Sequence, residues 1–244
     1  MRPLLAYRPN RIICLMIRHK GSAPITPTVD NRLKTLAFRP TVLLLVICDL
    51  EATCWVDGES PPIDDMEVIE IGCVLCDLAG NISDDFTTFV RPTKFPILSP
   101  FCTQLTSIRQ TDVDKAPIFV EAMGLLDDWC LKRNAFWASW GNYDRRLLLS
   151  QEQRTHCSPF FTRLPHVNLK KAWRRSVRNR SHSGLQAALD FHDLSFEGTP
   201  HRAIFDAKNT ARLLPFIQRR EIGLQLDQFS EGTLGVNSLH GRPN

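Results

Sequence analysis

The sequence predicts an α/β domain built on a mixed five-stranded sheet flanked by helices. Short apolar, β-branched runs alternate with segments whose apolar residues recur at helical spacing. The first three predicted strands follow one another through short turns, whereas the later strands are separated by helices, which favours a mixed sheet. The chain has 244 residues, and 43% of them are apolar, enough for one sizeable core.

Each predicted strand has its own signal. Val42–Asp49 is continuous and rich in β-branched residues, as expected of a buried strand. The turn Ala79-Gly80-Asn81 separates the next two strands, and the last two are short and apolar. These four strands are predicted at Glu67–Leu78, Asp85–Val90, Ala135–Trp140 and His166–Leu169.

Helices are predicted where apolar residues recur every three or four positions. Pro92, Pro96 and Pro100 indicate a loop before the first of them. A capping-box pattern, Ser183-Gly184-Leu185-Gln186, starts a helix that ends near Phe191. The other predicted helices are 118–132, Asp144–Gln153 and Ile204–Gln218.

The two ends of the chain differ from the domain in composition. Residues 1–40 carry a net charge of +7, and the remaining residues carry −3. We predict a poorly ordered basic N-terminal extension over 1–40, a domain over 41–219 and a flexible, polar tail over 220–244. The Arg-rich start resembles an organelle transit peptide but lacks its Ser richness and amphipathic stripe. A start codon assigned too far upstream explains the extension equally well.

Cysteine usage and hydropathy indicate the compartment. The eight cysteines are scattered, and the one close pair, Cys73 and Cys76, lies in a strand where such residues point to opposite faces. This pattern favours reduced thiols in a cytoplasmic protein over a metal site. The apolar run Val42–Cys48 is far shorter than the ~20 residues of a membrane helix, so no membrane partner is expected.

Acidic residues follow two of the predicted strands and begin the last helix. Asp49 and Glu51 are two apart at a strand end, so both side chains lie on one face of the sheet. Asp144 opens the helix after the fourth strand, and Asp206 lies in the first turn of the last helix. Because ligand crevices form at strand ends in α/β sheets, we expect the four carboxylates to converge.

Converging carboxylates repel one another or take up protons unless a cation binds between them. Hard oxygen ligands suit Mg²⁺ or Mn²⁺. Two such ions ~4 Å apart can stabilise the attacking and leaving oxygens of a phosphodiester displacement. His201, five residues before Asp206 on a loop expected to be mobile, can act as the general base. The sequence therefore predicts a two-metal phosphodiesterase site with two Mg²⁺ (or Mn²⁺).

Taken singly, each of these residues has a structural explanation. An Asp-x-Glu pair is common in loops, and Asp144 and Asp206 suit helix N-termini on charge grounds alone. A lone histidine is usually a surface or core residue. The chemical interpretation depends on all five occurring in order and on matching elements.

The motifs resemble a known family. Asp49-Leu50-Glu51-Ala52-Thr53-Cys54-Trp55 resembles the first motif of the DEDDh, DnaQ-like 3′→5′ exonucleases, and specifically their Eri-1/KapD branch. Trp140-Gly141-Asn142-Tyr143-Asp144 is similar to the second motif of that branch. Similar stretches occur at Ser99–Ile108 and His166–Lys170, and the resemblance covers roughly Val42–Ile217.

The resemblance implies a ribonuclease H-like fold and stepwise release of nucleoside 5′-monophosphates from a 3′ end. It assigns Asp49, Glu51, Asp144 and Asp206 to the metals and His201 to the general base. It also implies that Glu51, the Ala52 backbone and His201 meet the terminal nucleotide. Phe205 departs from the family, which commonly has a polar or acidic residue there, and this change is expected to affect the loop that carries His201.

A basic segment follows the fifth strand. It holds six cations and no acid within eleven residues, and it also contains Trp173, which could stack a base. The segment is the best candidate for contacting phosphates, and the alternative is a solvated basic face. Its cations are Lys170, Lys171, Arg174, Arg175, Arg178 and Arg180.

The function that we predict is a metal-dependent 3′→5′ exonuclease acting on nucleic acid with a free 3′ end. The family resemblance favours RNA, or a short single strand, as the substrate. A DNA-directed trimming or proofreading exonuclease is the first alternative, and a non-catalytic nucleic-acid-binding module is the second. The sequence does not indicate the oligomeric state.

Overall fold

The computed structural model describes residues 43–56, 58–131, 133, 135–179 and 184–236, with the backbone alone for 229–236. The predicted basic extension over 1–40, Arg180 and the Ser183 cap lie outside these residues. None of the described helices is both long and apolar enough to cross a membrane.

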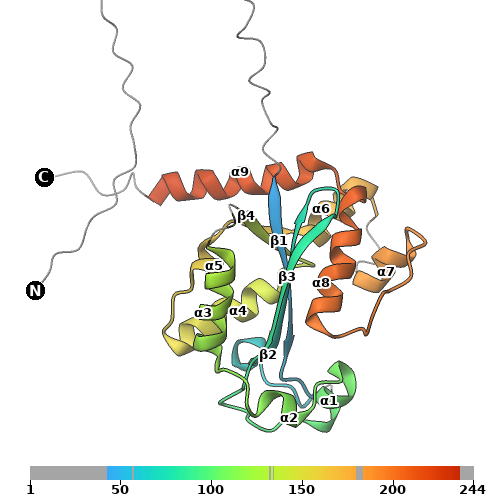
Figure 1. Cartoon of the computed structure of the whole chain (residues 1–244). Helices are drawn as coiled ribbons and strands as arrows, with labels where there is room; N and C mark the ends of the chain where they lie inside the picture. Colours follow the sequence, from blue (N-terminus) through green and yellow to red (C-terminus); the bar gives the residue numbers. More distant parts are fainter. Residues whose placement is uncertain (1–42, 57, 132, 134, 180–183, 237–244) are drawn as a thin grey trace, which may run out of the picture. The chain divides into compact units, whose positions relative to one another are not determined.

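A mixed five-stranded sheet forms the centre of the described domain, as predicted (Figure 1). The strand order is β3-β2-β1-β4-β5, in which β1 pairs antiparallel with β2 and parallel with β4. The strands are β1 (Leu44–Ala52), β2 (Val68–Asp77), β3 (Ile82–Phe89), β4 (Ala135–Ser139) and β5 (His166–Asn168).

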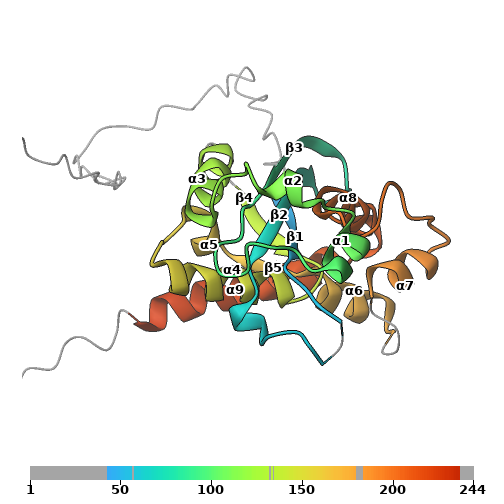
Figure 2. The same ribbon diagram turned by 90° about the horizontal axis from the view of Figure 1, so that it is seen from below.

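Helices cover both faces of the sheet, as Figures 1 and 2 show. One face is covered by α3 (Phe119–Cys130), α4 (Tyr143–Thr155) and α5 (Phe160–Arg163). The other is covered by α6 (Leu169–Val177), α7 (Leu185–Asp190), α8 (Ala203–Arg212) and α9 (Arg219–Val236). The remaining helical turns are α1 (Pro100–Thr106), α2 (Gln110–Val113), η2 (Ile63–Asp65) and η3 (Leu214–Phe216).

Strand β1 has a different role on each face. Its even-numbered residues Val46, Cys48 and Leu50 are buried under α3 and α4. The odd-numbered residues Leu45 and Ile47 are buried on the α8 side. Because side chains alternate along a strand, Asp49 and Glu51 continue this second row. The odd-numbered side chains of β1 are therefore apolar and part of the core at its start and are carboxylates near its end.

The structure moves several of the predicted boundaries. Strand β1 continues to Ala52 rather than ending at Asp49, because its pairing with β2 extends that far. The loop predicted through Pro100 ends earlier: this proline begins α1, and Ser99 Oγ caps that helix by accepting the Cys102 N–H at 2.9 Å. Helices α2, α5 and α6 are further elements that the pattern analysis did not predict.

The C-terminal region departs most from the prediction. The helix expected over Ile204–Gln218 ends at Arg212, because Pro215 lacks the N–H that a continuing helix needs. The expectation of a loose tail from Arg219 is wrong for the next eighteen residues, which form α9. In this helix Ile222 is buried in the core, and Gln225 Nε2 donates to the Asn168 carbonyl at 3.2 Å.

The position of α8 depends on Gly72 in β2. A Cβ atom at this position would overlap the backbone of Ala203 and Ile204, so the first turn of α8 lies directly on the strand. Gly72 pairs with Asp49 across the β1–β2 ladder. The glycine therefore brings the helix end that carries Asp206 next to Asp49.

We predict that Gly72→Ala destabilises the protein by about 1–3 kcal/mol, because the added methyl forces α8 away from the sheet. Gly124→Ala in α3 is the matched control, since a Cβ there meets nothing within 4 Å. It should be neutral or stabilising by up to about 1 kcal/mol. Urea denaturation measures both variants, and equal stability of the two would contradict this account of α8 packing.

Candidate active site

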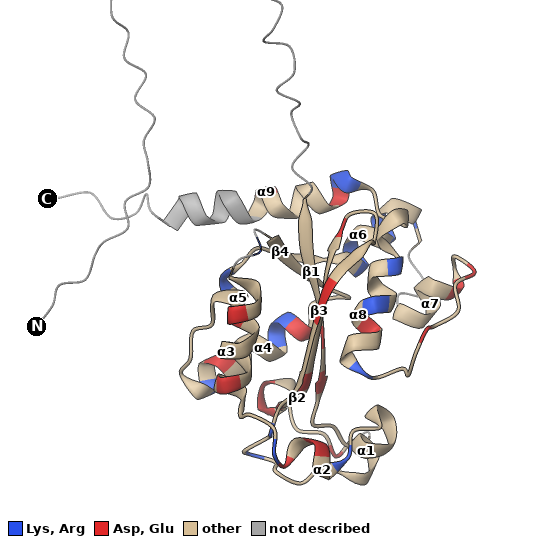
Figure 3. Ribbon diagram, in the orientation of Figure 1, with Lys and Arg blue, Asp and Glu red and all other residues tan. Residues whose placement is uncertain are grey.

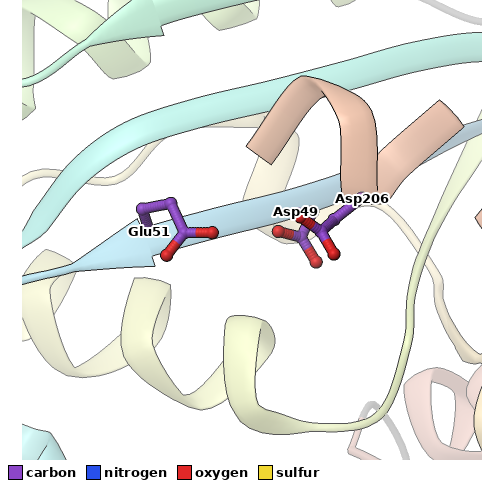
Figure 4. Close-up of side chains that lie close together, drawn as sticks. All are labelled: Asp49, Glu51 and Asp206. Carbon is purple, nitrogen blue, oxygen red and sulfur yellow. The ribbon is translucent and has the colours of Figure 1, made fainter. Parts of the chain in front are cut away.

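Three carboxylates meet at the β1–α8 contact. Asp49 and Glu51 project from β1, and Asp206 projects from the first turn of α8 toward them (Figure 4). Each of the three offers an oxygen atom within 4.8 Å of the other two. The period-two prediction for Asp49 and Glu51 is confirmed, because both side chains lie on the same face of β1.

Asp144 approaches the same cluster from the start of α4. Its side chain is buried, which raises its pKa, and the nearby Leu50 backbone and Ser139 hydroxyl oppose this shift. Its charge raises the pKa of both Asp49 and Glu51, so it lies close enough to interact with each. The structure therefore brings all four predicted carboxylates into one electrostatic unit, with Asp144 outside the tightest group of three.

Burial and the repulsion between neighbouring negative charges both favour the protonated, neutral form of these carboxyl groups. Burial, reinforced by Asp206 and Glu70, raises the pKa of Glu51 to about 9. Burial also raises the pKa of Asp144 and of Asp206 to about 6, and in Asp206 the nearby His201 opposes this shift. The pKa of Asp49 rises because of its burial and the charges of Asp144, Asp206 and Glu51.

The cluster fits a divalent cation. Its donors are carboxylate oxygens, which are hard ligands that divalent ions such as Mg²⁺ and Mn²⁺ prefer. A cation among them removes the repulsion that otherwise requires protons. Asp49, Glu51 and Asp206 would hold such an ion, and Asp144 adds a fourth negative charge beside them.

His201 lies at the edge of the cluster. Its side chain is exposed, and its backbone adopts the left-handed conformation at φ 57°. The backbone N–H groups of His201 and Arg202 donate to the Asp206 carboxylate, the latter at 3.2 Å. The exposed ring is therefore available to a substrate or a water molecule at the cluster.

Ser139 and His166 support the Asp144 side of the site, and the sequence analysis assigned neither of them a role. Ser139 Oγ lies 2.9 Å from His166 Nε2 and 3.1 Å from the Gly141 carbonyl oxygen, and the presence of its hydroxyl lowers the pKa of Asp144. Burial, together with the charge of Arg145, lowers the pKa of His166 to about 3, so its ring is neutral at physiological pH. A polar residue that ends an otherwise apolar strand, as Ser139 does, was the available sequence signal.

The basic segment forms α6 and borders a hollow of about 580 Å³. Lys170 connects this hollow with the carboxylates, because it packs beside Gly141 and its charge lowers the pKa of Asp144. Five of the predicted cations line the hollow: Lys170, Lys171, Arg174, Arg175 and Arg178.

The structure contradicts the prediction for Trp173 and shows the surroundings of Ala52. The suggestion that Trp173 stacks a base is wrong, because its ring is fully buried and its Nε1 donates to His192 Nε2 at 3.0 Å. Ala52 is the last residue of β1, and its carbonyl accepts a weak hydrogen bond from Cys102 Sγ at 3.6 Å.

Comparison with known proteins identifies relatives of the whole domain. A family described as Exonuclease (RNase_T) matches residues 46–214. The 3′-5′ exonuclease eri1 of Schizosaccharomyces pombe is 30% identical over an alignment of 199 residues, which covers 70% of this chain and 66% of that protein. The chain thus spans less than two thirds of that relative, and 27% and 31% of two further relatives.

Solved structures of similar proteins share the fold. The nuclease domain of 3′hExo, a DEDDh family member bound to rAMP, is 30% identical with a TM-score of 0.65, covering 71% of this chain and 90% of that one. A 3′-exonuclease structure concerned with recognition of the histone mRNA stem-loop is 27% identical with a TM-score of 0.64. It covers 70% of this chain and 80% of the other. The predicted ribonuclease H-like fold is confirmed by these neighbours.

We predict that the metal-free protein loses stability as the pH rises from about 4 to 9. A carboxyl whose folded pKa is raised binds its proton more tightly in the folded state, so stability falls as that proton is lost. Glu51, whose pKa is shifted from 4.5 to about 9, should contribute strongly together with Asp49, and divalent metal should restore stability at pH 8–9.

Thermal melts in EDTA and in Mg²⁺ between pH 5 and pH 9 measure this effect. Glu51→Gln should flatten the pH dependence, whereas Glu59→Gln, which removes an exposed carboxyl outside the cluster, should leave it unchanged. Equal slopes in the two variants, or no response to metal, would contradict the proposed electrostatics.

Proposed function

The chain belongs to the exonuclease family, in the DEDDh branch with the Eri1-type enzymes, and from this membership we propose that it removes nucleotides from the 3′ end of RNA. The observation that carries the proposal is the meeting of Asp49, Glu51 and Asp206 on the β1–α8 contact, with Asp144 beside them. Relatives named as 3′-5′ exonucleases and exoribonucleases support the direction of cleavage and the RNA substrate.

The proposed mechanism assigns each group a task. Asp49, Glu51, Asp144 and Asp206 hold two divalent ions, for which we propose Mg²⁺ with Mn²⁺ as a substitute. Such ions, when bound, stabilise negative charge on the oxygens of the phosphodiester. His201 accepts the proton of the attacking water, and its exposed place beside Asp206 suits this role. Glu51 and the backbone of Ala52 meet the terminal nucleotide.

The basic hollow along α6 provides a path for the rest of the strand. Figure 3 shows Lys and Arg on this helix. Lys170 lies between the hollow and Asp144, so phosphates upstream of the cleaved bond can follow the cations away from the carboxylates. Glu221 lies 3.5 Å from Arg175 and partly offsets the charge of that cation.

We also propose that the protein acts in the cytoplasm. All seven cysteines in the described part of the chain are free thiols, which suits a reducing compartment.

A degradation time course on 5′-labelled RNA and DNA of one sequence tests the function. With Mg²⁺ we expect a ladder that shortens from the 3′ end, faster on RNA, and none in EDTA. Asp206→Asn should reduce the rate by at least about 1000-fold and weaken metal binding, whereas His201→Ala should lower the rate alone. Faster decay of DNA would favour the DNA-trimming alternative, and full activity of Asp206→Asn would contradict the assigned site.

A second experiment tests the α6 path. Arg174→Gln with Arg175→Gln should weaken single-strand binding on the order of tenfold on every sequence and reduce the slope of log K against log salt by about 1.4. The control is Lys208→Gln with Arg133→Gln, which removes the same charge beside β3 at the opposite edge of the sheet. An unchanged slope in the α6 variant, measured by fluorescence anisotropy, would exclude these phosphate contacts.

A further inference from the structure

An acidic residue lies near the start of β2, a strand that is buried along nearly its whole length. Glu70 occupies β2, where nearly every neighbour is buried and apolar, and only 1% of its own side chain is exposed. A buried carboxylate requires a partner, because an unpaired charge in the interior is costly. Its partner is Arg202, which the chain places immediately after His201.

The contact between Glu70 and Arg202 is extensive. Arg202 Nη2 donates to Glu70 Oε1 at 2.8 Å, and Arg202 Nε donates to Glu70 Oε2 at 3.1 Å. The Ala203 backbone N–H also donates to Glu70 Oε2, at 3.0 Å. The Arg202 guanidinium lies 5.3 Å from the centre of the Phe89 ring, which limits its movement further. This arrangement uses the planar fork of arginine, which a lysine cannot reproduce.

Glu70 also lies next to the carboxylate cluster. It pairs directly with Glu51 across the β1–β2 ladder, so the two side chains lie on the same face of the sheet. The ion pair therefore joins β2, the strand beside the cluster, to Arg202, which lies between His201 and the first residue of α8. Because the Arg202 N–H donates to Asp206, the same residue is fixed to both sides of the site.

The other end of the loop is held separately. Asn209, which is fully buried, accepts the Glu197 N–H at 3.0 Å and donates to the Glu197 carbonyl at 2.8 Å. The Phe205 ring, the departure from the family pattern, packs closely against Gly198. Residues 197–202 are thus fixed at both ends, in contrast to the mobile loop that the sequence suggested.

We propose that Glu70 and Arg202 are positioning residues that hold His201 in its place at the carboxylate cluster. Their ion pair fixes the backbone on the C-terminal side of His201. The backbone of His201 is in the left-handed conformation, which costs free energy for a residue other than glycine and is maintained by the surrounding structure. The inference rests on the proposed exonuclease function, because it assigns His201 the role of the base.

The test is a double-mutant cycle between Arg202→Lys and His201→Ala. Arg202→Lys retains the positive charge but cannot make the paired hydrogen bonds of the guanidinium group to Glu70. We therefore expect kcat to fall roughly 10- to 100-fold, with little change in KM. In the His201→Ala background the same substitution should lower kcat by less than about twofold, because no base remains to be positioned. Steady-state assays with substrate in excess measure kcat and KM for all four proteins.

Asp85→Asn is the matched control. It removes the 2.8 Å ion pair between Lys208 and Asp85, which also joins α8 to the sheet but is exposed and remote from His201, so kcat should not change. Thermal melts check that each variant is folded. If Arg202→Lys melts below the assay temperature, Glu70→Gln replaces it in the cycle, since it keeps the shape of the side chain.

Two results would overturn the inference. One is an unchanged kcat in the folded variant, and the other is an equal loss of kcat with and without His201. A wild-type protein that degrades neither RNA nor DNA with metal bound would instead contradict the proposed function, so the two failures are distinguishable.

Discussion

Electrostatic repulsion among carboxylates is the constraint on which this structure depends. Asp49, Glu51 and Asp206 place oxygen atoms within 4.8 Å of one another, and Asp144 adds a fourth charge beside them. Burial intensifies the repulsion because water cannot screen it. A fold that maintains such a group requires protons or a cation to balance the charge, and at neutral pH a divalent cation does so while leaving the carboxylates able to act in chemistry.

The fold keeps this group together through ordinary packing. The odd-numbered row of β1 is apolar at Leu45 and Ile47, which anchors the strand in the core before its carboxylates begin. Gly72 lets α8 lie on the sheet backbone, so Asp206 reaches Asp49 without a long side chain. The free energy gained by burying apolar side chains therefore offsets the repulsion between the carboxylates that the fold brings together.

The sequence was sufficient to predict the sheet and to name the four converging acids, because strand alternation and motif order are local signals. It could not predict α9, whose stability comes from Ile222 in the core and from Gln225 bonding the Asn168 backbone far away in the sequence. Nor did it identify the pairing of Glu70 with Arg202, which are 132 residues apart. The one available signal was a glutamate inside an apolar strand, and such a residue needs a partner that only the fold reveals.

The central claim is that the β1–α8 carboxylates form the metal centre of the enzyme. Anomalous X-ray diffraction from crystals grown with Mn²⁺ and a nucleoside 5′-monophosphate tests it most directly. We expect Mn²⁺ peaks in contact with Asp49, Glu51 and Asp206, with the nucleotide phosphate beside them and His201 facing it. Ordered nucleotide with no Mn²⁺ at these carboxylates, or Mn²⁺ bound only elsewhere on the protein, would contradict it.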